Sequence, residues 1–297
     1  MLDMKTFIVS RSIFGTGGGS SSGGSAESGD GELLYKPITW AQVHDRNHAA
    51  FDFNGTTYYY SVTGTNGNAR IYSFDGETFT KVIDVPSSFA TYLALDILVE
   101  TIVFHDKVFF RSSKSVGTWD GTTFEMITTD LTADISYTDS DGVQSFNIID
   151  DKLYYLLVNS RNIYILLYNE TNNAFEYQGN FRAGSYLGPI FTYNGELYCV
   201  YQTNLIKIDI VNQSSSIITS SLCVSTYPRR YLVDGNYVYC WYPRDRSYNI
   251  LRINMETLES EEILPPGVAS IMFKHGEDKY MTILNVSDGV SVCKLIE

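Results

Sequence analysis

The sequence predicts an all-β fold, a six-bladed β-propeller with about four strands per blade, and three observations lead to this prediction. Short apolar runs alternate with polar residues as in half-buried strands, and helical periodicity is hard to find. Two-residue turns such as Asn54-Gly55 and Asn194-Gly195 separate these runs, as expected for β-hairpins. A unit with two such turns recurs six times at intervals of about 40 to 51 residues, the spacing of propeller blades.

The repeated unit is defined by the order of its two turns. Copies of the first turn are Asn54-Gly55, His105-Asp106, Asp150-Asp151, Asn194-Gly195, Asp234-Gly235 and Gly276-Glu277. The clearest copies of the second turn are the Asp-Gly pairs 75–76 and 120–121, which predict type I′ turns. Because two registers recur in one order, we expect blades at 44–85, 86–135, 136–180, 181–222, 223–264 and 265–297.

The first 31 residues predict a docking arm joined to the propeller by a flexible linker. Residues 1–14 contain a short alternating run that predicts an N-terminal docking arm, and residues 15–31 form a Gly/Ser-rich linker. The candidate partner-binding residues are the apolar side chains of the arm, which would dock by strand addition: Phe7, Ile8, Val9, Ile13 and Phe14. An ordinary disordered terminus is the alternative.

Residues 32–43 predict the strand that closes the ring. The last repeat stops one strand short at residue 297, and Leu33 to Trp40 can supply the missing outer strand. Closure of this kind joins the first and last blades by main-chain hydrogen bonds. The propeller domain is therefore expected to span residues 32–297.

Charge and hydropathy exclude two classes of partner. The formal net charge of −13 opposes non-specific nucleic-acid binding, which depends on clustered Lys and Arg. The local basic cluster of Arg229, Arg230, Arg244 and Arg246 is interpreted as a solvated loop edge. Because no apolar run reaches the roughly 18 residues of a membrane helix, we expect no membrane insertion.

The four cysteines predict free thiols and a reducing site of folding. Cys199, Cys223, Cys240 and Cys293 show neither CxxC pairing nor metal spacing, and Cys199 and Cys240 occupy nearly equivalent repeat positions. A disulfide framework is the weaker interpretation. The N-terminus has no proper signal peptide, so we expect synthesis in a cytoplasm.

No motif selects a catalytic, cofactor or metal site, so the sequence predicts a non-enzymatic protein without cofactors. Asp139 to Gly142 begins like a calcium loop, but the positions beyond it hold Gln144 and Phe146. His44 and His48 would share a face only on a helix, and they lie among predicted strands. No pair of carboxylates is singled out for glycoside hydrolysis.

Two family resemblances follow from the repeat. The first turn, an aromatic strand, and a second turn before Phe79, Phe124 or Phe175 together resemble the kelch repeat of β-propellers over residues 44–297. The kelch double glycine is absent, and pairs such as Tyr60-Ser61 stand in its place. The segments Ser73–Phe79 and Thr118–Phe124 are similar to the Asp-box of sialidase-type propellers, one residue too short.

The arm, the linker and the all-β domain together resemble tailed-bacteriophage virion proteins. This resemblance implies a structural or interaction protein of a virion, made in the host cytoplasm and attached through its arm. The implied partners are other virion proteins, and a host-surface glycan or receptor. A carbohydrate-binding or sialidase-like enzyme is the alternative, and an intracellular kelch-like adaptor is a third hypothesis.

Overall fold

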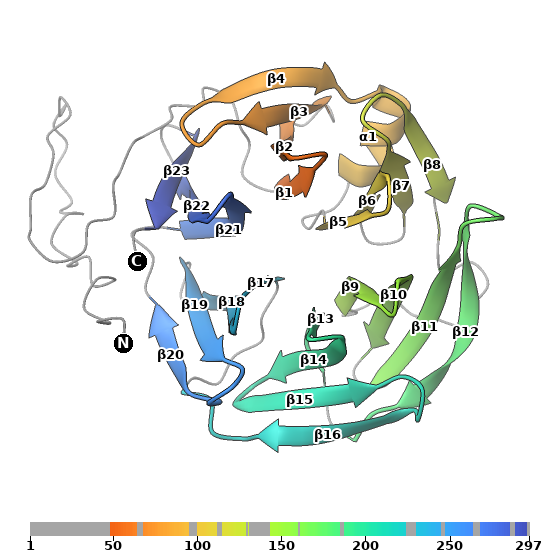
Figure 1. Cartoon of the computed structure of the whole chain (residues 1–297), viewed down its shortest axis with the longest axis vertical. Coiled ribbons are helices and arrows are strands. Elements are labelled where there is room, and N and C mark those ends of the chain that lie inside the picture. The colour runs from red at the N-terminus through yellow and green to blue at the C-terminus, as the bar shows by residue number, and fades with distance from the viewer. Residues whose placement is uncertain are drawn as a thin grey trace, which may run out of the picture.

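The protein folds as a ring of six antiparallel sheets around a central axis (Figure 1). This computed structural model describes residues 48–63, 68–94, 100–111, 115–128, 130, 143–159, 161–184, 187–223, 230–244, 247–263, 268–285 and 289–295. Within these ranges, five sheets have four strands and the sixth has three, each in chain order from the axis outward. The prediction of an all-β propeller with four-stranded blades is therefore confirmed.

The strands of the first three blades follow one another along the chain. Blade 1 contains β1 (His48–Phe53), β2 (Thr56–Thr63), β3 (Asn68–Phe74) and β4 (Phe79–Asp84). Blade 2 contains β5 (Glu100–Phe104), β6 (Lys107–Arg111), β7 (Val116–Trp119) and β8 (Phe124–Thr128). Blade 3 contains β9 (Val143–Ile149), β10 (Lys152–Asn159), β11 (Asn162–Asn169) and β12 (Ala174–Arg182).

The remaining blades repeat this order. Blade 4 contains β13 (Ile190–Tyr193), β14 (Glu196–Tyr201), β15 (Asn204–Asp209) and β16 (Ser214–Thr219). Blade 5 contains β17 (Arg230–Asp234), β18 (Tyr237–Arg244), β19 (Ser247–Asn254) and β20 (Ser260–Ile263). Sheet 6 contains β21 (Val268–His275), β22 (Asp278–Asn285) and β23 (Gly289–Leu295). The predicted closing strand, residues 32–43, lies outside the described residues.

The first turn of each unit joins the innermost strand to the second strand, as predicted. Both central residues have positive φ at Asn54-Gly55, Asp150-Asp151 and Asn194-Gly195, which is the type I′ pattern. In blade 5 the register Asp234↔Tyr237 makes Gly235-Asn236 the central pair, one residue later than predicted. Asn and Gly recur here because they tolerate positive φ best.

The second turn corrects the predicted type I′ conformation. At Asp75-Gly76 and Asp120-Gly121 only the glycine has positive φ. Each aspartate instead accepts hydrogen bonds from the backbone N–H groups two and three residues later, as in an Asx turn. Polar residues do the same in three further blades, namely Asn169, Asp209 and Asn254. The hydrogen bonds that Asp75 accepts from the backbone N–H groups of Thr78 and Glu77 lower its pKa to about 2.

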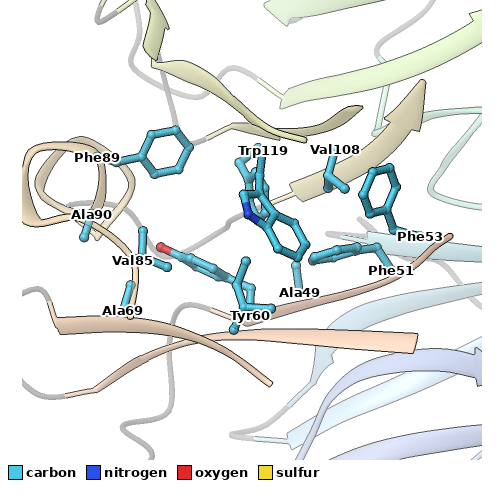
Figure 2. Close-up of a cluster of buried hydrophobic side chains, with 12 residues drawn as sticks. Ala49, Phe51, Phe53, Tyr60, Ala69, Val85, Phe89, Ala90, Val108 and Trp119 are labelled. Atoms are coloured by element: carbon cyan, nitrogen blue, oxygen red, sulfur yellow. The ribbon is translucent and has the colours of Figure 1, made fainter. Parts of the chain in front are cut away.

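The hydrophobic core is divided among the junctions between neighbouring sheets. Figure 2 shows the junction of blades 1 and 2, where Phe51, Phe53 and Trp119 pack together. Comparable clusters lie between blades 2 and 3, 3 and 4, and 4 and 5, and a fifth joins blade 5, sheet 6 and blade 1. Each sheet is thus stabilised by burying both faces against its neighbours.

One helix, α1 (Ser87–Ala94), interrupts the strands between blades 1 and 2. Helical periodicity is hard to find in the sequence, and this segment shows no clear helical pattern either. The N–H groups of Phe89 and Ala90 bond the Pro86 carbonyl, which starts the helix. The Phe89 ring packs over Gly117, where an added Cβ would lie 2.2 Å from the ring. A tertiary contact therefore fixes this segment as helix.

The outer strands of blades 1 to 4 share a β-bulge that the sequence did not reveal. One residue of each outer strand has no opposite residue in the register: Val82, Ile127, Gln178 and Ile218. Bulges twist an edge strand and hinder pairing with other chains. They also account for exposed apolar side chains at Val82 and Ile218.

Candidate functional site: the central channel

A cavity of about 410 Å³ lies in the central channel. The innermost strands β1, β5, β9, β17 and β21 contribute to its wall, together with Trp241 of β18. We call the end where the innermost strands begin the strand-start end, marked by Glu100, Gln144 and Arg230. We call the opposite end, where these strands turn into the second strands, the hairpin end.

A buried polar network forms one side of the strand-start end. Glu100 and Arg111 are cross-strand partners in blade 2, and Arg111 Nε donates to Glu100 Oε2 at 2.5 Å. Arg111 also donates to the side chain and main-chain oxygens of Gln144 in blade 3, at 3.2 and 2.5 Å. The hydroxyl of Tyr155 donates to the same side-chain oxygen at 2.5 Å. Burial alone would lower the pKa of Arg111, but the Glu100 carboxylate outweighs it, so the guanidinium stays charged.

Blade 5 supplies the other side of the strand-start end. Arg230 and Trp241 are cross-strand partners, so their side chains leave the same face of the sheet. The next residue, Tyr231, leaves the opposite face and packs on Phe191 of blade 4, with ring centroids 5.2 Å apart. Burial, reinforced by Glu100, raises the pKa of Tyr231 well above its ordinary value. Its phenol is therefore neutral at physiological pH.

The hairpin end holds a second charged group. Asp234 of blade 5 accepts from Lys274 Nζ at 2.6 Å and from Lys279 Nζ at 2.8 Å, both in sheet 6. Burial alone would raise the pKa of Asp234, but hydrogen bonds from Lys274 and Lys279 outweigh it and lower the pKa. The three groups therefore tie two neighbouring sheets together.

Two histidines occupy junctions at the hairpin end. His275 of sheet 6 is 2.9 Å from the hydroxyl of Thr57 in blade 1, and that hydroxyl donates to Asp52 at 2.5 Å. His105 of blade 2 contacts Asp151 and Glu170 of blade 3 at 3.2 and 2.9 Å. Both histidines lie at the first turn of their sheets, and their side chains join neighbouring sheets.

The arm residues predicted to bind a partner, Phe7, Ile8, Val9, Ile13 and Phe14, lie outside the described residues. So do His44, Asp139 to Gly142, Arg229 and Arg246. Arg230 corrects the interpretation of the basic cluster, because it begins β17 and lines the channel instead of belonging to a solvated loop edge. Cys199, Cys223 and Cys240 are free thiols as predicted, and the side chain of Cys293 is not described.

Sequence reasoning missed the channel residues Glu100, Arg111 and Gln144. A signal for the first two was present, because counting outward from the predicted turn His105-Asp106 places Glu100 opposite Arg111. Within the described ranges, no group of three His, Cys, Asp or Glu side chains could hold a metal ion. No described helix is long and apolar enough to cross a membrane.

Comparisons with known proteins give a fold and no family. No family model matches the sequence, and no curated protein matches it. A luciferin-regenerating enzyme superposes with a TM-score of 0.58 at 11% identity, covering 90% of this chain and 96% of the other. A protein of unknown function from Bacteroides thetaiotaomicron has a TM-score of 0.58 at 12% identity, covering 90% and 73%. At these identities the likeness establishes a β-propeller fold and nothing about kelch membership, activity or source.

Proposed function

We propose that this chain is a non-enzymatic structural or interaction protein of a tailed-phage virion, attached through its N-terminal arm. The propeller, which is kelch-like in its repeat, contacts other virion proteins or a host-surface glycan or receptor. The protein is made in the host cytoplasm and acts in the particle.

One observation in the channel supports a binding role over acid–base catalysis. Among the residues that the structure describes, the two carboxylates in the cavity wall each accept a hydrogen bond from a neighbouring side chain, Glu100 from Arg111 and Asp52 from Thr57. A general acid or base must exchange its proton with a substrate. A carboxylate engaged in a structural bond is better suited to holding the wall in shape.

The experiment separates the arm from the closing strand by two truncations. Removing residues 1–31 should leave a propeller of unchanged stability that no longer sediments with the particle fraction of an infected culture. Removing residues 1–43 should in addition lower the free energy of unfolding, because β23 would lose its proposed neighbour. A matched control keeps the full length and carries Ile8→Asp and Phe14→Asp. Normal incorporation of both the shorter truncation and this control would refute docking through the arm.

A second candidate is a carbohydrate-binding or sialidase-like enzyme, and one observation favours it. Arg111 and Arg230 from blades 2 and 5 line the same cavity, and convergent arginines suit acidic glycans. The decisive assay measures sugar release from sialylated and uronic-acid-containing glycans. Release that is abolished by Glu100→Gln, in protein with unchanged thermal stability, would replace the structural proposal. Absence of turnover would remove this candidate.

A further inference from the structure

The outer strand of blade 4 differs from the other outer strands in having no charged residue. β16 is the outermost strand of its sheet (Figure 1), and the sequence around it carries no charge from Ile210 to Pro228. The outermost described strand of every other sheet contains at least one charged residue: Lys81 and Asp84 in β4, Glu125 in β8, Glu176 and Arg182 in β12, Glu261 and Glu262 in β20, and Lys294 in β23. Charges on an edge strand hinder pairing with other chains, so β16 lacks a protection that the other edges have.

Exposed apolar side chains gather at the same edge. Among the described residues, five large apolar side chains are exposed, and three of them belong to blade 4, namely Val211 at 85%, Ile217 at 55% and Ile218 at 41%. Val211 lies in the turn between β15 and β16, where Asp209 accepts hydrogen bonds from the N–H groups of Val211 and Asn212. The turn therefore presents Val211 in a fixed position, and covering these side chains with a partner would be favourable.

The bulge at Ile218 limits the part of β16 that can pair with a further strand. The residues from Ser214 to Ile217 face β15 one to one, and the register shifts at Ile218. In an antiparallel edge strand, every second residue turns its N–H and C=O groups away from the sheet. The regular part of β16 can thus accept another antiparallel strand. Because blades 1 to 3 carry the same bulge, it does not replace the charge that β16 lacks.

The absence of charge indicates that the partner is a second copy of the chain. When two copies meet through the same strand about a two-fold axis, each charged residue near the axis lies close to its own copy, and the like charges repel each other. A different protein could instead match a charged edge with opposite charges. With a net charge of −13 on each copy, β16 is the described outer strand through which two copies meet the least repulsion.

We propose that two copies of this chain associate through β16, with the regular parts of the two strands paired antiparallel. This pairing joins two four-stranded sheets into one continuous sheet. It also brings the turn of one copy toward the bulge of the other, so that Val211 and Ile218 of both copies are covered. The contact requires neither the arm nor a particle, and it fails or stands separately from the virion role.

Sedimentation equilibrium of the full-length protein tests the contact. An edge of four regularly paired residues is smaller than a standard interface, so we expect a monomer–dimer equilibrium with a Kd of roughly 10–100 μM. Raising the salt concentration from about 0.05 to about 0.5 M should strengthen the dimer, because salt screens the repulsion between two acidic chains. A protein that stays monomeric up to about 1 mM, or a dimer that salt weakens, overturns the proposal.

Charge substitutions in the regular part of β16 assign the dimer to this strand. Ser216 is exposed there, and Ser216→Lys and Ser216→Glu should each weaken association at least about tenfold, because like charges would meet near the two-fold axis. An equimolar mixture of the two variants should dimerise again, since opposite charges then lie near each other. A mixture that stays as monomeric as either variant alone overturns the pairing of β16 with its own copy.

The matched control uses the other bulged outer strand with an exposed apolar residue at the bulge. Ile218→Lys should weaken the dimer at least about tenfold, whereas Val82→Lys, at the bulge of β4, should leave it intact. The full-length variant with Ile8→Asp and Phe14→Asp should associate as the natural protein does. Equal effects of Ile218→Lys and Val82→Lys overturn the proposal. Loss of the dimer in the arm variant also overturns it, because the arm would then be the occupant of the edge.

Discussion

At the strand-start end of the channel, both residues of the main ion pair belong to one hairpin. At the hairpin end, the carboxylate and its cationic partners belong to different sheets. Glu100 and Arg111 face each other across β5 and β6, and Arg111 then reaches Gln144 of blade 3. Asp234 of blade 5 has its two cationic partners in sheet 6. The first arrangement is an ion pair within one hairpin that Arg111 extends to the neighbouring blade, whereas the ion pairs of the second lie entirely between two sheets.

Polar contacts at the hairpin end extend this contrast around the ring. In the described part of the chain, His105 joins blades 2 and 3, Tyr193 reaches Asn236 of blade 5 at 3.5 Å, and His275 joins sheet 6 to blade 1. These contacts lie beside two-residue turns, where neighbouring sheets approach each other. At the strand-start end, Glu100, Arg111 and Gln144 line the cavity and also link blades 2 and 3. Polar contacts therefore join neighbouring blades at both ends of the channel, and at the strand-start end they also form part of the cavity wall.

The largest expected effect is the loss of the buried pair at the strand-start end. Arg111→Met should lower the free energy of unfolding by about 3–5 kcal/mol, because the Glu100 carboxylate would lose its cationic partner and the main-chain oxygen of Gln144 would lose the Arg111 donor, while both stay largely covered. The side chains of Arg111 and Glu100 are 10% and 25% exposed. Urea denaturation provides the measurement.

Two controls show whether burial of the ion pair causes the expected destabilisation by Arg111→Met. Lys207→Met breaks the exposed pair with Glu196 and should cost less than about 1 kcal/mol. The double variant Glu100→Gln with Arg111→Met should cost less than Arg111→Met alone, because no unpaired charge remains. If Arg111→Met and Lys207→Met cost the same, the network at the strand-start end is not a structural element of the wall.

The next effect concerns the fastening of blade 5 to sheet 6. Asp234→Asn should cost about 2 kcal/mol, between the values for exposed and fully buried pairs, because Lys279, only 8% exposed, would lose its ion pair with Asp234. Lys81→Met, which breaks an exposed pair with Asp84, is the control. An equal cost for both variants in denaturant titrations would show that the Asp234 pairs stabilise the fold no more than an exposed pair does.

Acid should weaken the hairpin end through the same carboxylate. The folded pKa of Asp234 lies below its ordinary value of 3.8, so its contribution to stability is complete above that pH and is lost as the pH falls through the folded pKa. The difference in unfolding free energy between the natural protein and Asp234→Asn should therefore shrink on acidification below pH 3.8. A difference that stays constant down to the lowest pH at which the protein is folded contradicts this assignment.

Local chemistry explains why the repeat could be predicted from the sequence. Asn54-Gly55 and Asn194-Gly195 predict their turns directly, because asparagine and glycine adopt positive φ more readily than other residues do. The Glu100–Arg111 pair follows from the predicted turn His105-Asp106 by counting along its hairpin. The helix at Ser87 could not be predicted with equal certainty, because the packing of Phe89 on Gly117 depends on a blade that comes later in the chain.

The channel itself depends on ring closure, and no local pattern carries that information. Arg230 lies more than a hundred residues from Arg111, and both line one cavity only because the blades between them complete an arc. In the sequence, Arg230 stands next to Arg229 and resembles a loop charge. The structure was therefore needed to locate the candidate site, whereas the strands and turns that carry it could be predicted from the sequence.

The smallest expected effect concerns His105, whose contacts lie at the exposed side of the hairpin end. The hydrogen bond with Asp151 raises the pKa of His105 above its ordinary value of 6.5, burial opposes the rise, and Glu170 adds to it. A raised folded pKa means that this contact stabilises the fold below pH 6.5 and that its contribution is lost as the pH rises through the folded pKa. Asp151→Asn should return the imidazole titration of His105 toward its ordinary midpoint. The imidazole proton signals of His105 report this titration. If the His105 midpoint does not move, Asp151 does not hold the proton at this junction, and the polar link between blades 2 and 3 rests on Glu170 alone.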